Sequence, residues 1–332
     1  MVRILKLTLF YLTIFLGFVV ILISLLTLLH DLSYWYSKVI DFPRLQYLIV
    51  ALFCLAGFLL LNKKWKVPAF LLVAGLFTAI TIQSLRIFPY FLGTKTVPDA
   101  PEVVDKGNVV KVLIANVFIE NRKSEELLQI IRDSSPDIIL AMEVNRHWIK
   151  ELEVLEENYP HTITYPTENA YGMALYSKLP FEDQEIEFFK HDSVPSFHMK
   201  VNLPSGKSFK FHAVHPVPPV PSEKYPDNVG EQEVALLKTA DKVAKDTLPS
   251  LVAGDFNDVS WSYTSRLFED TGNLKNVRIG RGLYNSFDAQ SVIMRWPLDH
   301  FFVTEGFSVL RLEKLPEFGS DHFPMLAELV VN

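Results

Sequence analysis

Polar side chains with the potential for catalysis follow several short apolar segments of this sequence. The apolar segments have the length and composition of buried β-strands. The polar residues at or near the ends of such segments are Asn116, Glu143, His215, Asp255, Asn257, Asp299, Asp321 and His322. Because strand ends meet at the edges of a sheet, this pattern predicts one site assembled from distant parts of the chain.

The eight residues offer carboxylate and carboxamide oxygens together with imidazole nitrogens, which indicates a site for a hard divalent cation. Such oxygens suit Mg²⁺, Mn²⁺ or Ca²⁺ and not a structural zinc ion. The only cysteine, Cys54, lies within an apolar run, which excludes a cysteine cluster and an intramolecular disulfide. A bound cation would neutralise phosphate charge while a carboxylate or an imidazole activates water. The residue types therefore predict metal-dependent hydrolysis of a phosphate ester.

Helix and strand patterns alternate around these residues and indicate two packed sheets. Val109–Ala115 is apolar except for Lys111, which is typical of a strand covered on both faces. Ser208–His215 alternates apolar and polar residues with the period of a half-buried strand, and Ser124–Asp133 has the pattern of an amphipathic helix. Helices and strands recur in two similar halves. We therefore expect an α/β fold, a four-layer sandwich of two mixed sheets flanked by helices.

Three long apolar runs precede this region and predict a membrane anchor over residues 1–92. They lie at about 7–29, 45–61 and 67–85, and their interiors carry no charge. Each is close to the roughly 20 residues that a helix needs to cross a bilayer core. Residues 93–107 contain two prolines and few apolar side chains, as in a linker. Residues 108–332 would then form the catalytic domain.

The distribution of Lys and Arg predicts the orientation of the anchor. Arg3 and Lys6 precede the first span, and Lys63, Lys64 and Lys66 lie between the second and the third. Because cytoplasmic loops are enriched in basic residues, both places are expected on the cytoplasmic side. Three crossings then put the catalytic domain outside the cytoplasm. The chain is thus predicted to be a multi-pass protein of the cell membrane.

The charge balance of the predicted catalytic region is acidic. The first 86 residues hold eight of the 32 Lys and Arg but only two of the 38 Asp and Glu, so the remainder carries 24 basic and 36 acidic side chains. Tight binding to nucleic acid relies on neutralisation of phosphates by Lys and Arg. The composition therefore argues against tight or processive DNA binding, while it leaves a weak degradative nuclease open.

The order of the polar motifs resembles that of the endonuclease/exonuclease/phosphatase superfamily, which has the deoxyribonuclease I-like fold. The resemblance covers about residues 108–332, and the segment His215-Pro216-Val217-Pro218-Pro219 is similar to membrane-bound bacterial members. Many members have glutamine before the metal-binding glutamate, whereas this chain has Met142 at that position. The motifs of this chain are Asn116, Met142-Glu143, Gly254-Asp255-Phe256-Asn257, Leu298-Asp299-His300 and Ser320-Asp321-His322.

The resemblance implies a metal site that holds Mg²⁺ or Mn²⁺. Glu143 would be the principal ligand, with Asn116 beside it. Asp321 would be an additional carboxylate near the metal.

The resemblance also implies the catalytic groups. His322 would be the imidazole at the scissile phosphate, oriented by Asp299. Asp255 would position or activate the water or assist the leaving group, and Asn257 would hydrogen-bond the phosphate. His215 would be a second imidazole on the opposite side of the site.

Three functions remain open at this level. A nuclease-type phosphodiesterase is the first, and a phosphodiesterase acting on phospholipid or sphingomyelin headgroups is the second. A non-catalytic membrane-anchored binding protein that kept the fold is the third. A basic groove as wide as DNA would favour the nuclease, whereas an apolar rim beside the site would favour the lipid enzyme.

Overall fold

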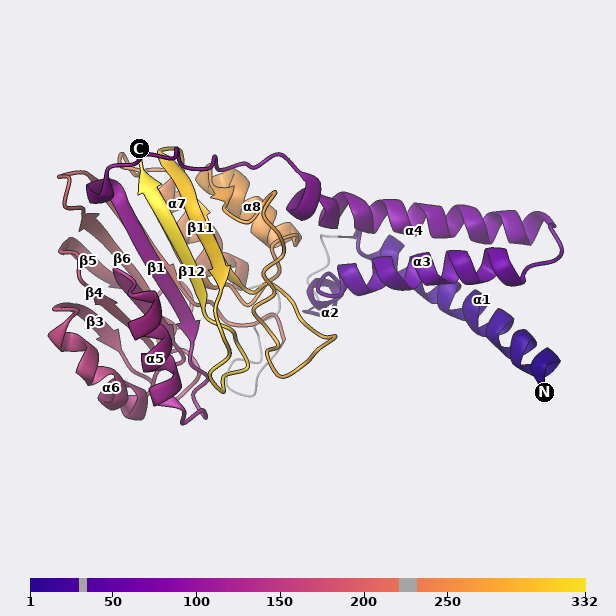
Figure 1. Cartoon of the computed structure of the whole chain (residues 1–332), viewed down its shortest axis with the longest axis horizontal. Helices are drawn as coiled ribbons and strands as arrows, with labels where there is room; N and C mark the ends of the chain where they lie inside the picture. Colours follow the sequence, from indigo (N-terminus) through magenta and orange to yellow (C-terminus); the bar gives the residue numbers. More distant parts are fainter. Residues whose placement is uncertain (30–34, 221–231) are drawn as a thin grey trace.

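An α/β sandwich and a bundle of three long helices make up the described part of the chain. The computed structural model describes residues 1–29, 35–220 and 232–332, without the side chains of residues 232 and 233. The sandwich lies at one end of the molecule and the long helices project from it as a separate rod (Figure 1).

Two six-stranded mixed sheets form the centre of the sandwich. The first sheet has the order β11-β12-β1-β2-β4-β3, and the second has the order β5-β6-β7-β8-β10-β9. The strands of the first sheet are β1 (Val109–Asn116), β2 (Ile138–Met142), β3 (His161–Tyr165), β4 (Met173–Ser177), β11 (Phe307–Lys314) and β12 (Met325–Val331). Those of the second are β5 (Phe181–Glu187), β6 (Ser196–Asn202), β7 (Ser208–Val214), β8 (Ser250–Asp255), β9 (Lys275–Asn276) and β10 (Asp299–Val303).

Strand β1 shows why the central strands read as nearly continuous apolar runs. Val112 and Ile114 point into the core between the two sheets, whereas Leu113 and Ala115 point into a second core under the helices. All four side chains are buried. Complete burial of a Val, Leu or Ile side chain contributes about 1.5–3 kcal/mol, so both faces of the strand stabilise the sandwich.

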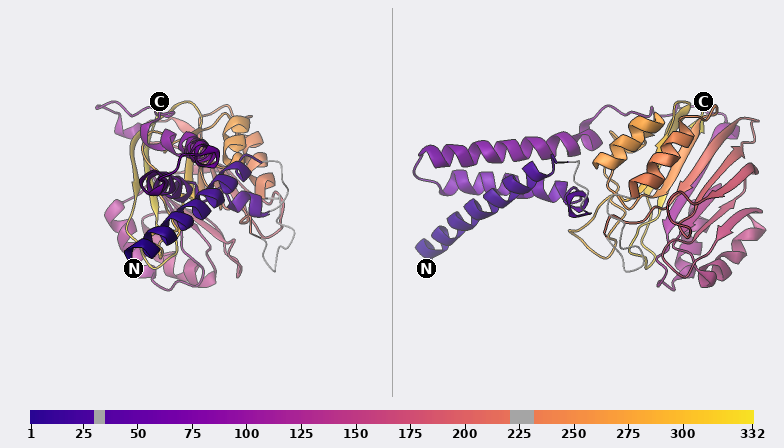
Figure 2. Two further views of the ribbon diagram at one scale, coloured as in Figure 1. Left: turned by 90° about the vertical axis from the view of Figure 1, so that its right-hand side faces the viewer. Right: turned by 180° about the vertical axis from the view of Figure 1, so that it is seen from behind.

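Helices cover the outer face of each sheet and complete the predicted four layers. One group packs on the first sheet and the other packs on the second. Figure 2 shows the second group lying across its sheet. The first group is α5 (Ser124–Ser134), α6 (Arg146–Leu152) and the 3₁₀-helix η2 (Glu153–Glu157), and the second is α7 (Gln232–Val243) and α8 (Tyr263–Gly272).

The three long helices have the length and composition of membrane spans. They are α1 (Val2–Leu26), α3 (Arg44–Leu61) and α4 (Val67–Leu92), with the short α2 (Trp35–Val39) before α3. They overlap the three predicted spans, and α4 continues beyond the expected end at residue 85. Most of their outward side chains are apolar and exposed, which suits a lipid environment.

Hydrogen bonds join the helical rod to the sandwich. The indole Nε1 of Trp261 donates to the carbonyl of Asp41 at 2.7 Å, and the amide of Gly282 donates to the carbonyl of Tyr90 at 2.8 Å. The predicted linker is also attached, because the amide of Ala100 donates to the carbonyl of Val309 on β11 at 2.9 Å. A 3₁₀-helix, η1 (Lys106–Asn108), then leads into β1.

A buried polar network ties the long helices together beside this junction. Arg44 donates to Asp41 Oδ1 at 2.7 Å and to Gln83 Oε1 at 3.1 Å. Gln83 in turn donates to Ser24 Oγ at 3.0 Å, so all three long helices take part. Buried polar groups are stable only when they are paired, so this network fixes how the helices meet at the sandwich.

Candidate functional site

Strand register brings the predicted site residues to one edge of the sandwich. Asn116 at the end of β1 pairs with Met142 at the end of the parallel β2, directly before Glu143. Asp255 at the end of β8 lies opposite Asp299 at the start of the antiparallel β10. The ends of β1 and β8 belong to different sheets, and the sandwich places them side by side.

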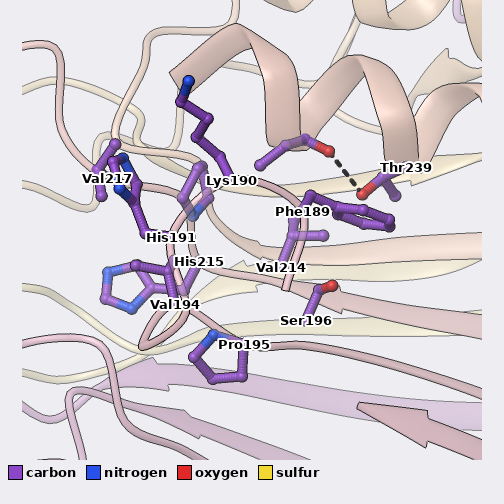
Figure 3. A pocket seen from close by; sticks show the side chains of 12 residues that line it. Phe189, Lys190, His191, Val194, Pro195, Ser196, Val214, His215, Val217 and Thr239 are labelled. Carbon is purple, nitrogen blue, oxygen red and sulfur yellow. Dashed lines mark hydrogen bonds between the residues drawn. The ribbon is translucent and has the colours of Figure 1, made fainter. Parts of the chain in front are cut away.

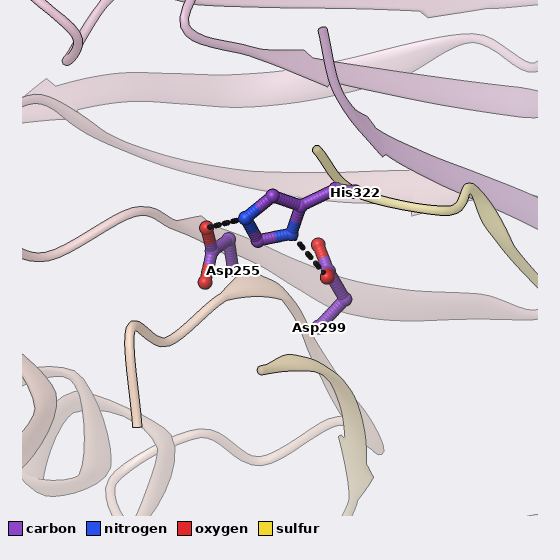
Figure 4. Close-up of side chains that lie close together, drawn as sticks. All are labelled: Asp255, Asp299 and His322. Carbon is purple, nitrogen blue, oxygen red and sulfur yellow. Dashed lines mark hydrogen bonds and ion pairs between the residues drawn. The ribbon is translucent and has the colours of Figure 1, made fainter. Parts of the chain in front are cut away.

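His322 sits between two buried aspartates, as Figure 4 shows. Its Nδ1 is 2.7 Å from Asp299 Oδ2, and its Nε2 is 3.6 Å from Asp255 Oδ2. Burial alone would lower the pKa of His322, but the two carboxylates outweigh that effect and raise the pKa to about 10. Burial raises the pKa of Asp255. Ligand atoms of the three residues all lie within 4.8 Å of one another, so the group could hold a metal ion.

Glu143 lies beside this cluster and is oriented by Asn116. Asn116 Nδ2 donates to Glu143 Oε1 at 2.9 Å and to Asp255 Oδ2 at 3.0 Å. The amide of Ile119 donates to Glu143 Oε2 at 3.2 Å. Burial raises the pKa of Glu143 to about 7, although the Asn116 amide and the charge of His322 both act to lower it. The buried position of Glu143 therefore disfavours a free negative charge on this carboxyl.

Asp321 is partly buried at the same edge. Burial raises its pKa, while the charge of His322 lowers it and that of Asp255 raises it further. The site thus holds four carboxyl groups against two imidazoles. A divalent cation would offset this excess of negative charge.

His215 approaches the same oxygen of Asp255 as His322 does. Its Nε2 is 3.8 Å from Asp255 Oδ2, and its Nδ1 has no hydrogen-bond partner among the described residues. Burial lowers the pKa of His215, which favours the neutral imidazole. Figure 3 shows His215 lining a small pocket with Val194, Pro195 and Val217.

Asn257 makes hydrogen bonds both to Asp255 and to the segment that follows His215. Its backbone amide donates to Asp255 Oδ1 at 2.8 Å, and its side-chain Nδ2 donates to the carbonyl of Pro216 at 3.0 Å. The second of these bonds ties the segment after His215 to the end of β8. The structure therefore gathers all eight predicted residues at this edge.

Several supporting residues were not found from the sequence. Met142 accepts a hydrogen bond on Sδ from the amide of Asp255 at 3.1 Å, so the residue before Glu143 also supports the opposite sheet. Arg278 is buried and donates to the carbonyl of Asp299. Ser320 Oγ donates to the carbonyl of Asn116 at 2.8 Å and accepts from the amide of His322 at 3.0 Å. The Ser-Asp-His order in the sequence could have indicated Ser320, whereas no sequence pattern indicates Met142 or Arg278.

Gly254 allows β8 to approach the segment that carries His215. Its φ is +149°, and an added Cβ would overlap the carbonyl oxygen of Val214. We expect Gly254→Ala to lower the free energy of unfolding by about 3 kcal/mol, because backbone atoms must move. Thermal unfolding of the purified protein, followed by near-UV circular dichroism, measures the change. Gly206→Ala is the control: its φ is also positive but its surroundings are open, so a cost of about 1 kcal/mol is expected. Equal costs would contradict the contact-based explanation.

Comparisons with known proteins agree with this architecture. The sequence profile of the Endonuclease/Exonuclease/phosphatase family matches residues 114–322. A search of the curated proteins finds no significant match.

Solved structures of low sequence identity share the fold. An endonuclease/exonuclease/phosphatase from Bacteroides vulgatus is 21% identical with a TM-score of 0.55, and the alignment covers 68% of this chain and 99% of that one. D. rerio TDP2 complexed with single strand DNA product is 13% identical with a TM-score of 0.54, over 68% and 99% of the two chains. The human Nocturnin catalytic domain with bound sulfate is 15% identical with a TM-score of 0.54, over 69% and 97%.

The strand register, the buried aspartate–histidine cluster and the profile match lead to one assignment. The site residues from Asn116 to His322 lie inside the matched range. The chain belongs to the Endonuclease/Exonuclease/phosphatase family.

Proposed function

We propose that this protein is a membrane-anchored phosphodiesterase that depends on a divalent cation. The observation that carries the proposal is the buried cluster of His322 between Asp299 and Asp255. An imidazole held by one carboxylate and facing another across 3.6 Å can share a water or a phosphate oxygen with it. A binding protein without catalysis has no need for such a buried, charged arrangement.

Mg²⁺ or Mn²⁺ is the proposed cation, with Glu143 as its principal ligand. When bound, the cation would neutralise phosphate charge and polarise the phosphoryl group. Asn116 Oδ1 accepts from the amide of Phe118 at 3.0 Å, while its Nδ2 faces Glu143. We therefore propose that Asn116 positions Glu143 in the described arrangement, and that Asp321 supplies the further carboxylate. Asn116 Oδ1 keeps a second lone pair after it accepts from Phe118, so the same oxygen could also ligate the cation.

The remaining residues of the cluster have separate roles in the proposed reaction. Asp299 holds Nδ1–H of His322, so that Nε2–H of the imidazolium can donate to a phosphate oxygen. Asp255 orients a water molecule and accepts its proton. His215 lies 3.8 Å from Asp255 Oδ2, and its Nδ1 has no hydrogen-bond partner among the described residues. As a neutral imidazole it could pass a proton to or from the leaving group.

Nucleic acid is one candidate substrate, as the sequence first indicated. The likeness to D. rerio TDP2, solved with single strand DNA product, supports it. The acidic balance of the region after residue 86 argues for weak binding if nucleic acid is cleaved.

The proposed location of the site is outside the cytoplasm. Arg3 and Lys6 at the start of α1, and Lys63, Lys64 and Lys66 before α4, all lie at the end of the rod that is remote from the sandwich (Figure 1). By the preference of basic residues for the cytoplasmic side, the sandwich would face the other side.

Hydrolysis of bis(p-nitrophenyl) phosphate by the full-length protein in detergent tests the proposed function. We expect turnover with Mg²⁺ or Mn²⁺, its loss on addition of EDTA, and a decrease of about 10²- to 10⁴-fold in Asp255→Asn. Asp183→Asn, at an exposed carboxylate of β5, is the matched control and should keep full activity. If the folded wild type shows no metal-dependent turnover above Asp255→Asn, the non-catalytic binding protein becomes the better hypothesis.

A further inference from the structure

The segment from Asn285 to Trp296 lies between the imidazole of His322 and the start of α3. The ring of Phe287 lies 4.9 Å from that of His322, and the ring of Trp296 stacks on Phe287 at 6.2 Å. Trp296 also contacts Phe42, just before α3, at 5.8 Å between ring centroids. A continuous row of aromatic rings thus connects the site to the start of a membrane span.

The tip of this segment presents apolar side chains to the outside. Val292 is 87% exposed, Ile293 is 74% exposed and Met294 is 47% exposed. Gln46, in the first turn of α3, donates through Nε2 to the carbonyl of Ile293 at 2.8 Å. The tip therefore lies beside the first turn of a candidate span, at the level where that helix would leave the bilayer. In Figure 1 this loop reaches from the sandwich toward the side of the rod.

Hydrogen bonds within the tip hold its apolar side chains outward. The amide of Ser291 donates to the carbonyl of Asp288 at 3.2 Å, and that of Met294 donates to Ser291 Oγ at 2.9 Å. Arg295 donates through Nη2 to the carbonyl of Ala289 at 3.1 Å. Three exposed apolar side chains in succession on a braced loop indicate a contact surface, and a bilayer is the partner next to it.

We propose that residues 291–294 insert into the surface of the bilayer that the anchor spans, so that the site acts on the phosphodiester of a lipid headgroup in that leaflet. This inference rests on the proposed phosphodiesterase function. The apolar tip fits a lipid surface. The acidic balance of the chain after residue 86 is a poor match for a polyanionic nucleic acid. Water would supply the oxygen of the new P–O bond, and one ester P–O bond would break. The leaving oxygen would take up a proton, giving an alcohol and a phosphomonoester.

Full-length protein in vesicles of phosphatidylcholine and phosphatidylglycerol with Mg²⁺ or Mn²⁺ tests the inference. Mass spectrometry of the released phosphomonoester and alcohol measures lipid hydrolysis, and bis(p-nitrophenyl) phosphate measures the chemistry alone. In the double variant Val292→Asp/Ile293→Asp, we expect lipid hydrolysis to fall by about tenfold or more and hydrolysis of the soluble diester to stay unchanged. Val154→Asp is the matched control. Val154 is 60% exposed on η2, which directly follows α6 at the side of the sandwich far from the rod (Figure 1), and both activities should persist.

A second measurement follows the tip without using activity. An environment-sensitive fluorophore on Ile293→Cys, in a Cys54→Ser background, should be quenched by spin-labelled lipids. The same fluorophore on Val154→Cys should not be quenched. Equal quenching at the two positions would overturn the insertion of the tip.

The possible results separate the two proposals. Turnover of the soluble diester without turnover of either phospholipid overturns the lipid inference and leaves the phosphodiesterase function standing; cleavage of single-stranded DNA in a parallel assay would then identify a nuclease. If the wild type turns over neither the phospholipids nor the soluble diester, the proposed function itself is overturned. A parallel decrease of both activities in the double variant would show that the tip supports the site and not contact with lipid.

Discussion

Substitution of His322 by alanine is expected to lower kcat by about a thousandfold or more, with the fold retained. A general acid or base typically contributes 10²- to 10⁴-fold, and the imidazolium of His322 also offsets negative charge on the phosphate. Its environment supports a large value, because two buried carboxylates contact it and raise its pKa to about 10. Steady-state hydrolysis of bis(p-nitrophenyl) phosphate by full-length protein measures the effect.

His147→Ala provides the matched control for this substitution. His147 is partly exposed on α6, and its Nδ1 lies 3.9 Å from Glu151 Oε1 in the same helix. Its loss should change kcat by less than about twofold. A His322 variant that keeps more than a tenth of the wild-type kcat would contradict the assigned role.

The pH dependence of Asp299→Asn distinguishes electrostatic stabilisation of the imidazolium from positioning of the ring alone. The Asp299 carboxylate stabilises the imidazolium, so its removal lowers the pKa of His322. If activity requires the protonated imidazole, the alkaline limb of the kcat profile should move to lower pH in the variant. An unchanged limb with uniformly lower kcat would mean that Asp299 only holds the ring in place.

Much of the fold was predictable because its central strands are buried on both faces. The continuous apolar pattern of Val109–Ala115 is a direct result of cores on either side of β1. Edge strands are less constrained: the middle residues of β5 (Phe181–Glu187) are exposed, so the sequence of this strand gives little apolar signal. The third span was expected to end near residue 85, but its helix continues to Leu92, where Tyr90 packs on Trp261 of the sandwich.

The site was predictable where chemistry restricts the residue type. A carboxylate or imidazole at the buried end of an apolar strand lowers the stability of the fold, so its presence there indicates a function. Glu143, Asp255 and His322 could be selected from the sequence on this basis. The contacts that surround them depend on tertiary structure. Phe287 against His322 and Gln46 against Ile293 join segments distant in sequence, and nothing local in the sequence marks either pair. The apolar rim that favours a lipid substrate could therefore be recognised only in the folded chain.

Glu143→Gln is expected to abolish tight binding of Mn²⁺, with a loss of affinity of at least about a hundredfold. The substitution keeps the shape but removes the charge that a hard cation requires. It also leaves one oxygen to accept from either Asn116 Nδ2 or the Ile119 amide, where glutamate accepts from both. Isothermal titration calorimetry on the full-length protein in detergent measures the affinity. Glu305→Gln, at a carboxylate whose side chain is 80% exposed, should bind Mn²⁺ as the wild type does.

The raised pKa of Glu143 gives this prediction a pH dependence of defined sign. Because the carboxyl has a pKa of about 7 without a cation, it is protonated below that pH, and a cation must displace the proton. The apparent affinity of the wild type for Mn²⁺ should then fall by up to about tenfold per pH unit below 7. An affinity that stays constant between pH 5 and about 7 would contradict ligation by Glu143.

The same shift predicts how the substitution affects stability in the absence of metal. A carboxyl whose pKa is higher in the folded state binds protons more tightly there, so the folded protein loses stability as pH rises from the unfolded value near 4.5 toward 7. Glutamine carries no charge and avoids that cost, which offsets the loss of one hydrogen-bond acceptor. At neutral pH without a divalent cation, Glu143→Gln should therefore unfold at a temperature equal to or above that of the wild type, and addition of Mn²⁺ should raise only the melting temperature of the wild type. A variant that is less stable than the metal-free wild type would show that Glu143 holds the fold together, and its loss of activity could not then be attributed to the cation.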